Sequence, residues 1–145
     1  MRRAAADDAV VVAALALQCA IHRGGTSEPG FLDRHARAWL AKQGELPVWL
    51  AEAGDEHGGF LQARVLEPLP VPGEAPRPTL LVETFFVRPP HRGIGVGEQL
   101  LQAAVAWARD GGFAEVRVPA GRQTTAMVER VGFIPDERAH RMALP

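Results

Sequence analysis

Hydrophobic positions in the first part of the chain repeat with the period of an α-helix. Leu15 and Cys19 fall on one face of an apolar segment that Asp8 can cap and that Gly24 can end. A second helix is predicted from Pro29 to Lys42, where hydrophobic residues recur with the same period and charged residues lie between them. These two helices are expected to follow a short edge strand at the N-terminus.

Beyond residue 45 the pattern becomes that of β-strands. Strands are predicted at Pro47–Ala53 and Gly59–Leu66, and the polar residues 54–58 between them are typical of a hairpin connection. Pro68–Pro78 contains five prolines and is predicted to be a loop. Thr79–Val87 is too apolar for an exposed edge, so we expect this strand inside the sheet.

Helices and strands alternate in the last third of the chain. After a helix that ends near Gly111, a strand is predicted at Ala114–Val118, a short helix at Gln123–Arg130 and a closing strand at His140–Leu144. This order predicts one α/β domain over residues 1–145, with a central mixed, mostly antiparallel sheet flanked by helices.

Composition and charge narrow the classes of function. The 145 residues carry a formal net charge of −1, which gives no global field for nucleic acid or an anionic membrane. No apolar stretch approaches the roughly 20 residues that cross a bilayer. The single cysteine, Cys19, excludes an intrachain disulfide, and the five histidines have no metal-ligand spacing. We therefore expect a cytoplasmic protein with no metal, nucleic acid or membrane partner.

The candidate chemistry lies between the apolar strand and the next helix, where Gly93, Gly95 and Gly97 fall within five residues. A strand–glycine loop–helix presents backbone N–H groups at the positive end of the helix, a geometry that holds phosphate. Glu98 follows Gly97, so the lysine and hydroxyl residue that complete a P-loop are missing. The third glycine of a dinucleotide fingerprint is also missing. A glycine turn without a ligand is the remaining alternative.

The residues around the glycines resemble the acyl-coenzyme A loop of the GNAT N-acetyltransferases. A second segment, Ala126–Phe133, resembles the helix–glycine–phenylalanine signature near the end of that family's domain. The resemblance covers most of the chain and implies a GNAT-like fold. The residues that match the central motif are Glu83, Phe86, Val87, Pro89, Arg92, Gly93, Gly95, Gly97, Leu100 and Leu101.

The resemblance implies that acetyl-CoA binds as a co-substrate. Its pyrophosphate would lie on the loop amides, which glycines let it approach closely, and Arg92 would add a charged donor. Its pantetheine arm would pair with the preceding strand as an extra strand does. The implied coenzyme-binding residues are Phe85, Phe86, Val87, Arg92, Gly93, Ile94, Gly95, Val96, Gly97 and Glu98.

Glu83 is the candidate catalytic residue, because many members of the family carry a glutamate at this position of the strand. It would act as the general base that deprotonates the acceptor amine. Apolar neighbours such as Leu81 and Phe85 would make its carboxylate a stronger base. A structural or substrate-orienting carboxylate is the alternative interpretation.

The proton donor of the family has no counterpart in this chain. Many relatives carry a tyrosine where this sequence has Val128, and the chain contains no tyrosine. Gly121 stands where an asparagine is common. The resemblance therefore implies an N-acetyltransferase for a primary amine of a small molecule or peptide, and a homodimer is compatible with it. A catalytically weak acyl-CoA-binding module of the same fold is the alternative.

Overall fold

One five-stranded sheet, in the order β1-β2-β3-β4-β5, organises the described residues of this computed structural model, which are 1–119, 121, 124–136 and 142. The strands are β1 Arg2–Arg3, β2 Val48–Ala53, β3 Glu56–Leu66, β4 Thr79–Val87 and β5 Glu115–Arg117. The helices are η1 Ala6–Asp8, α1 Ala9–His22, α2 Phe31–Ala41, η2 Pro89–His91, α3 Val96–Asp110 and α4 Thr125–Val131. Neighbouring strands are antiparallel except β4 and β5. The predicted fold class is confirmed.

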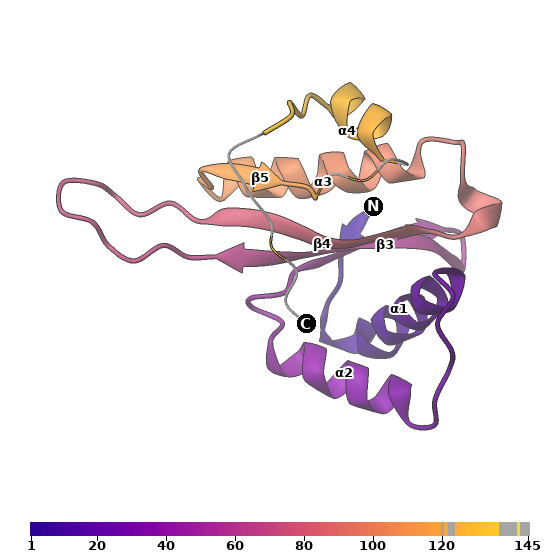
Figure 1. Cartoon of the computed structure of the whole chain (residues 1–145). Coiled ribbons are helices and arrows are strands. Elements are labelled where there is room, and N and C mark those ends of the chain that lie inside the picture. Colours follow the sequence, from indigo (N-terminus) through magenta and orange to yellow (C-terminus); the bar gives the residue numbers. More distant parts are fainter. Residues whose placement is uncertain (120, 122–123, 137–141, 143–145) are drawn as a thin grey trace.

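Helices cover both faces of the sheet, with α1 and α2 on one side and α3 and α4 on the other (Figure 1). Alternation along the strands supplies a core to each side. Val48, Leu50 and Phe60 pack with α1 and α2, whereas Trp49 and Leu61 pack with α3. The sheet therefore separates two hydrophobic cores.

The hairpin between β2 and β3 is tighter than the sequence predicts. Ala53 pairs with Glu56, which leaves a two-residue turn in which Gly54 has a φ of +63°. Such turns need a positive φ, which glycine adopts without strain. An irregularity in the register places Gly58 opposite no residue of β2, so β3 continues through Gly58 and Gly59. Glycine here marks a bulge and not the end of the strand.

The proline-rich loop between β3 and β4 extends away from the body of the molecule (Figure 1). It exposes Leu69, which is 85% accessible to solvent. Its base is fastened by Arg77, which donates to the carbonyl oxygens of Gly112 and Phe113 at 2.9 and 2.6 Å. The predicted loop is confirmed, and Arg77 ties it to the end of α3.

β4 has different neighbours along its length, and this difference positions the candidate site. On one side it pairs with β3 from Thr79 to Val87. On the other side its pairing with β5 is confined to Thr79–Leu81 within the described part of the chain. Among the described residues, therefore, nothing pairs with this edge of the C-terminal half of β4 (the open edge), just before the glycine loop.

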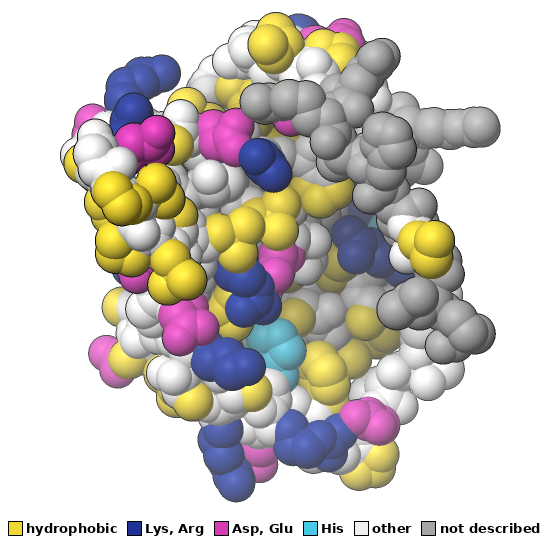
Figure 2. Space-filling view, turned by 60° about the vertical axis from the view of Figure 1, so that its left-hand side comes forward, with side chains coloured by type: hydrophobic (Ala, Val, Ile, Leu, Met, Phe, Trp, Pro, Cys, Tyr) yellow, Lys and Arg dark blue, Asp and Glu magenta, His cyan; other side chains and the backbone are white. Residues whose placement is uncertain are grey.

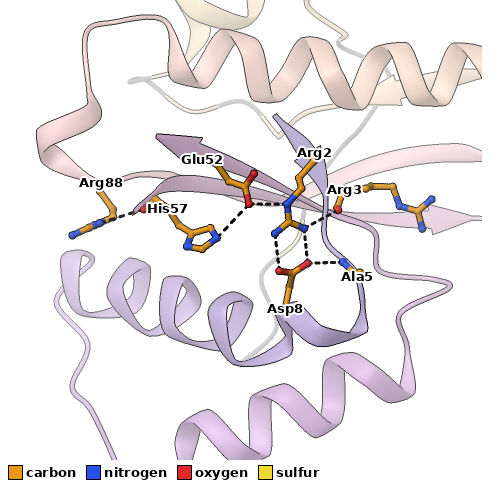
Figure 3. Close-up of polar contacts among 7 residues, drawn as sticks. All are labelled: Arg2, Arg3, Ala5, Asp8, Glu52, His57 and Arg88. Carbon is orange, nitrogen blue, oxygen red and sulfur yellow. Dashed lines mark hydrogen bonds and ion pairs between the residues drawn. The ribbon is translucent and has the colours of Figure 1, made fainter. Parts of the chain in front are cut away.

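A polar network fixes the N-terminus against the sheet (Figure 3). Arg2 donates to both carboxylate oxygens of Asp8, at 2.6 and 2.8 Å, and to Glu52 at 2.7 Å. Asp8 also accepts the backbone N–H of Ala5 at 2.7 Å. The hydrogen bonds from Arg2 are the main reason that the pKa of Asp8 is lowered to about 2. The network joins β1, η1 and β2.

Some expectations fall outside what the structure describes. The predicted strand His140–Leu144 lies there, apart from Met142. So does Gln123, the first residue of the predicted helix Gln123–Arg130, which corresponds to α4. Among the described residues, none of the helices combines the length and hydropathy that crossing a membrane requires. These residues likewise hold no group of three or more His, Cys, Asp and Glu side chains arranged for a metal ion.

Candidate functional site

The glycine loop carries the open end of β4 into the first turn of α3. Gly93 and Gly95 have φ values of +76° and +83°, and Gly95 is the N-cap residue of the fifteen-residue helix α3. None of the backbone N–H groups from Gly93 to Glu98 has a protein acceptor in the part of the chain that the structure describes. Consecutive free amides at a helix N-terminus can bind an anion such as a pyrophosphate.

The three glycines of the loop are needed for two different reasons. At Gly93 and Gly95 space is free, since a Cβ atom would meet nothing closer than 3.9 Å. The constraint there is the positive φ, which glycine adopts without strain. At Gly97 the constraint is space. A Cβ atom there would lie 2.8 Å from the ring of Phe85 and 2.9 Å from the sulfur of Met127. Gly97 therefore lets α3 approach β4 and α4 closely.

The hydrogen-bond ladder determines which residues offer their backbone to the open edge of β4. Arg88 donates its backbone N–H to the carbonyl of Gly58 at 2.8 Å, and Val87 lies opposite Gly59. Alternation along an antiparallel pair then directs the backbone groups of Phe86 toward β3, and those of Phe85 and Val87 toward the open edge. Of the three residues predicted to contact a pantetheine arm, Phe85 and Val87 thus present their backbone groups to the open edge, and Phe86 does not.

Arg92 lies across this edge. Its Nε donates to the carbonyl oxygen of Val87 at 2.8 Å, and its Nη2 lies 2.9 Å from Nε2 of His22 on α1. The guanidinium also lies 5.9 Å from the ring centroid of Phe86. Arginine has no acceptor, so His22 must accept through Nε2. Arg92 is thus next to the loop, as predicted, but its side chain is folded back on the strand.

Glu83 lies at an irregularity of β4, and its surroundings differ from those predicted. Gln62 pairs with Thr84 and Ala63 with Val82, so Glu83 has no partner opposite it on β3. Its carboxylate accepts hydrogen bonds from Nε of Arg64 at 2.5 Å and from Gln62 at 3.3 Å. The expectation of an apolar setting is wrong, because the bulge turns Glu83 toward the polar side chains of β3.

The second family-like segment forms α4, which packs beside the start of α3. Val128, which stands where the resemblance predicts a tyrosine, is partly buried against the core on the α3 side. The hydroxyls of Thr124 and Thr125 both donate to the carbonyl of Gly121, at 3.1 and 3.0 Å, and so stabilise the first turn of α4. None of these three side chains replaces the missing phenol as an acid.

Three basic side chains near the site were not among the sequence predictions. Arg64 holds Glu83, His22 contacts Arg92, and Arg130 of α4 binds the carboxylate of Glu98 at 2.6 Å. Each contact joins residues at least 19 positions apart in the sequence. Local patterns carry no signal for such contacts.

Positive and negative side chains are interspersed on the face in Figure 2, where a hollow beside the grey residues shows hydrophobic side chains and a histidine.

Comparison with known proteins identifies the family to which this fold and glycine loop belong. The chain belongs to the acetyltransferase (GNAT) family, whose model matches residues 13–133. An aminoglycoside N(6')-acetyltransferase type 1 from Stenotrophomonas maltophilia is 40% identical over 95 residues. That alignment covers 65% of this chain and 56% of the relative, so the chain spans little more than half of that protein.

Solved structures support the same fold. A predicted acetyltransferase from Clostridium acetobutylicum, solved with acetyl-CoA, has a TM-score of 0.79 at 15% sequence identity. The alignment covers 98% of this chain and 94% of that protein. An aminoglycoside acetyltransferase from an uncultured soil metagenomic sample, solved with trehalose, has a TM-score of 0.81 at 21% identity, with coverages of 99% and 93%. At these identities the likeness establishes the fold and not the substrate.

Proposed function

We propose that this chain is an acetyl-CoA-dependent N-acetyltransferase that transfers an acetyl group directly to a primary amine of a small molecule or peptide. The observation that carries the proposal is the row of amides from Gly93 to Glu98, which have no protein acceptor among the described residues. These amides adjoin the open edge of β4. Together they match a ligand with a pyrophosphate at one end and an amide-bearing arm beside it.

The residues present fit this coenzyme. The pyrophosphate would accept the N–H groups of the loop, where Gly93 and Gly95 supply the left-handed backbone. The pantetheine amides would pair with Phe85 and Val87. Because Arg92 donates to Val87 in this structure, its guanidinium has to leave that carbonyl when the arm binds. It would then be free to contact the phosphates.

The reaction exchanges a thioester for an amide. The amine nitrogen attacks the thioester carbonyl, an N–C bond forms, and the C–S bond breaks to release the coenzyme A thiolate. Glu83 takes the proton of the incoming ammonium, and the thiolate takes one from water or from the substrate. Positioning of the two reactants beside the bulge in β4 supplies much of the rate. Cys19 is buried in α1, which is consistent with direct transfer without an acyl-enzyme.

The relatives suggest small-molecule amines as the first acceptors to test. The protein from Stenotrophomonas maltophilia is an aminoglycoside acetyltransferase by name. Another structure of the metagenomic aminoglycoside acetyltransferase contains sisomicin and has a TM-score of 0.77 at 20% identity. An acceptor panel should therefore contain aminoglycosides, polyamines, amino acids and peptides with free N-termini.

A catalytically weak acyl-CoA-binding module is the second candidate. The observation that favours it is Val128, which cannot donate a proton and stands where the family resemblance leads us to expect a tyrosine. The two candidates share the coenzyme site and differ in turnover. Release of thiol from acetyl-CoA in the presence of the acceptor panel separates them.

The test combines calorimetry with the thiol assay. We expect micromolar binding of coenzyme A and amine-dependent thiol release, and Gly95→Val should abolish both because it blocks the left-handed N-cap of α3. Gly73→Val is the matched control. Gly73 has a similar φ of +82° in the distant hairpin loop, so binding should survive. Binding without turnover on any amine would select the second candidate, and undiminished affinity in Gly95→Val would refute the coenzyme site.

A further inference from the structure

Both carboxylate oxygens of Glu83 are held by donors from the neighbouring strand. Nε of Arg64 donates to Oε1 at 2.5 Å, and Nη2 of the same guanidinium donates to Oε2 at 3.3 Å. Nε2 of Gln62 also donates to Oε2, at 3.3 Å. A planar guanidinium that contacts both oxygens fixes the plane of the carboxylate as well as its position.

The irregularity in β4 makes this arrangement possible. Gln62 and Arg64 are two residues apart on β3, so their side chains lie on the same face of the sheet. Glu83 is the residue of β4 without a partner opposite it, and the bulge sends its carboxylate to that same face. The side chains of Arg64 and Glu83 are 35% and 27% exposed, so the pair is accessible to a substrate.

We propose that Arg64 is a positioning residue for acetyl transfer, which orients the carboxylate of Glu83 toward the acceptor amine. This inference rests on the proposed function, in which Glu83 receives the proton of the ammonium. Arg64 touches neither substrate nor coenzyme and acts through Glu83 alone. Gln62 contributes a neutral second donor to the same carboxylate.

The geometry leaves one acceptor position of the carboxylate for the substrate. An ionised carboxylate has about four lone-pair positions. Arg64 and Gln62 occupy one on Oε1 and two on Oε2, so the remaining position on Oε1 is available to an incoming ammonium. The hydrogen bonds from Arg64 and Gln62 therefore determine which carboxylate oxygen of Glu83 receives the proton, and from which direction.

The charges around Arg64 stabilise its contact with Glu83 and favour a cationic acceptor substrate. The hydrogen bond to Glu83 is the main reason that the pKa of Arg64 is raised, and the charge of Glu45 adds to the effect. Arg64 thus stays protonated throughout the range in which enzymes are assayed. Arg64, Glu83 and Glu45 together carry one more negative than positive charge, which attracts an ammonium group.

A double-mutant cycle tests the inference with the full chain. Thiol release is measured at saturating acetyl-CoA for Arg64→Met, Glu83→Gln and the double variant. We expect Glu83→Gln to lower kcat about a hundredfold and Arg64→Met to lower it roughly tenfold with little change in KM. In the Glu83→Gln background, Arg64→Met should have no further effect, because a residue that acts through Glu83 loses its influence with it.

Further variants separate orientation from charge and from folding. Arg64→Lys keeps the charge but not the two-oxygen contact, so kcat should be restored only in part. Arg34→Met removes an exposed guanidinium that pairs with Glu28 far from β4 in sequence, and it should leave kcat unchanged. Calorimetric binding of coenzyme A reports folding and should be the same in every variant.

The outcomes distinguish failure of the inference from failure of the proposed function. If Glu83→Gln loses activity but Arg64→Met multiplies that loss, Arg64 acts independently of Glu83 and the inference is overturned. Wild-type kcat in Arg64→Met has the same consequence. If Glu83→Gln is itself fully active while coenzyme still binds, Glu83 is not the base, and the proposed mechanism fails before Arg64 is considered.

Discussion

Arg92 and Val87 are joined by a hydrogen bond of 2.8 Å from the guanidinium to the backbone carbonyl on the open edge of β4. A ligand that pairs with this edge competes with that bond. His22 stabilises the same conformation of Arg92, since its Nε2 lies 2.9 Å from Nη2. The protein therefore makes contacts of its own at the position where the pantetheine arm is proposed to bind.

Weakening this conformation should improve coenzyme binding. His22→Ala removes one contact of the Arg92 side chain and keeps the charge of Arg92. One contact fewer then has to be broken when the coenzyme binds. We expect the dissociation constant for coenzyme A to fall about twofold to fivefold, which corresponds to a modest hydrogen bond at a solvent-accessible position. Calorimetry provides the measurement.

The matched control is Ile21→Ala, one residue earlier in α1, where the side chain is 48% exposed. It should leave the dissociation constant unchanged. An affinity in His22→Ala that is equal to or weaker than that of the wild type would show that His22 does not hold Arg92 away from the ligand.

The ion pair between Arg2 and Asp8 makes stability dependent on acid pH. The pKa of Asp8 falls from 3.8 to about 2 in the folded protein, mainly through hydrogen bonds from Arg2. A carboxyl group with a lowered folded-state pKa stabilises the fold above its unfolded value. The contribution is complete above pH 3.8 and is lost as the pH falls through about 2. Because Arg2 is 41% exposed, we expect only about 1 kcal/mol from this pair.

Arg2→Met should therefore lower the free energy of unfolding by about 1 kcal/mol at pH 7 and by less at pH 2.5. Urea denaturation at a series of pH values measures this difference. Arg3→Met removes the same charge from β1 without touching Asp8, so any cost should be the same at both pH values. A cost of Arg2→Met that does not vary with pH would contradict the assignment.

The close approach of β3 and β4 depends on Gly59. A Cβ atom there would lie 2.5 Å from the carbonyl oxygen of Phe86 and 3.0 Å from Cα of Val87. Both neighbours are backbone atoms, which cannot move without opening the ladder. Gly59→Ala should lower the free energy of unfolding by about 3 kcal/mol, at the upper end for overpacking.

Gly44 provides the control, because a Cβ atom at that position meets nothing within 4 Å. Gly44→Ala should be neutral within about 0.5 kcal/mol, as substitutions away from packed or strained sites usually are. Both variants are compared by urea denaturation. A Gly59→Ala protein as stable as Gly44→Ala would show that the two strands are farther apart than described.

Local sequence patterns predicted the elements of the fold well, because glycine and proline mark their ends. Thr79–Val87 agrees with β4 at both ends. The glycine loop was also predictable, since its chemistry depends on consecutive residues. Gly58 and Gly59 were less informative, because a glycine that ends a strand and one that forms a bulge look the same in a single sequence.

The polar contacts of the site could not be predicted in the same way. Whether Glu83 faces apolar or polar neighbours depends on the register between β3 and β4, and one unpaired residue changes the answer. His22 and Arg92 are 70 positions apart, and only the packing of α1 against the sheet brings them together. Backbone groups of successive residues in β4 point alternately to β3 and to the open edge. The sequence does not show which residues point which way, so the prediction included Phe86 with Phe85 and Val87.

Gly97 and Phe85 offer a test of how closely α3 packs on the open part of β4. The Cβ atom of a larger residue at position 97 would overlap the Phe85 ring, with a separation of only 2.8 Å. Gly97→Val should lower the free energy of unfolding by about 2 kcal/mol, because the Phe85 ring is partly buried and packed against the core, so neither the ring nor the helix can move freely.

The cost of Gly97→Val should depend on Phe85 if this overlap is its cause. In a Phe85→Ala background the space is free, so the additional cost of Gly97→Val should fall by at least half. Residues in contact show such coupling, whereas distant residues contribute independently. Urea denaturation of the wild type, both single variants and the double variant measures the coupling. Additive costs would mean that Gly97 is limited by Met127 of α4 and not by β4, since the Met127 sulfur is the other atom within 3 Å.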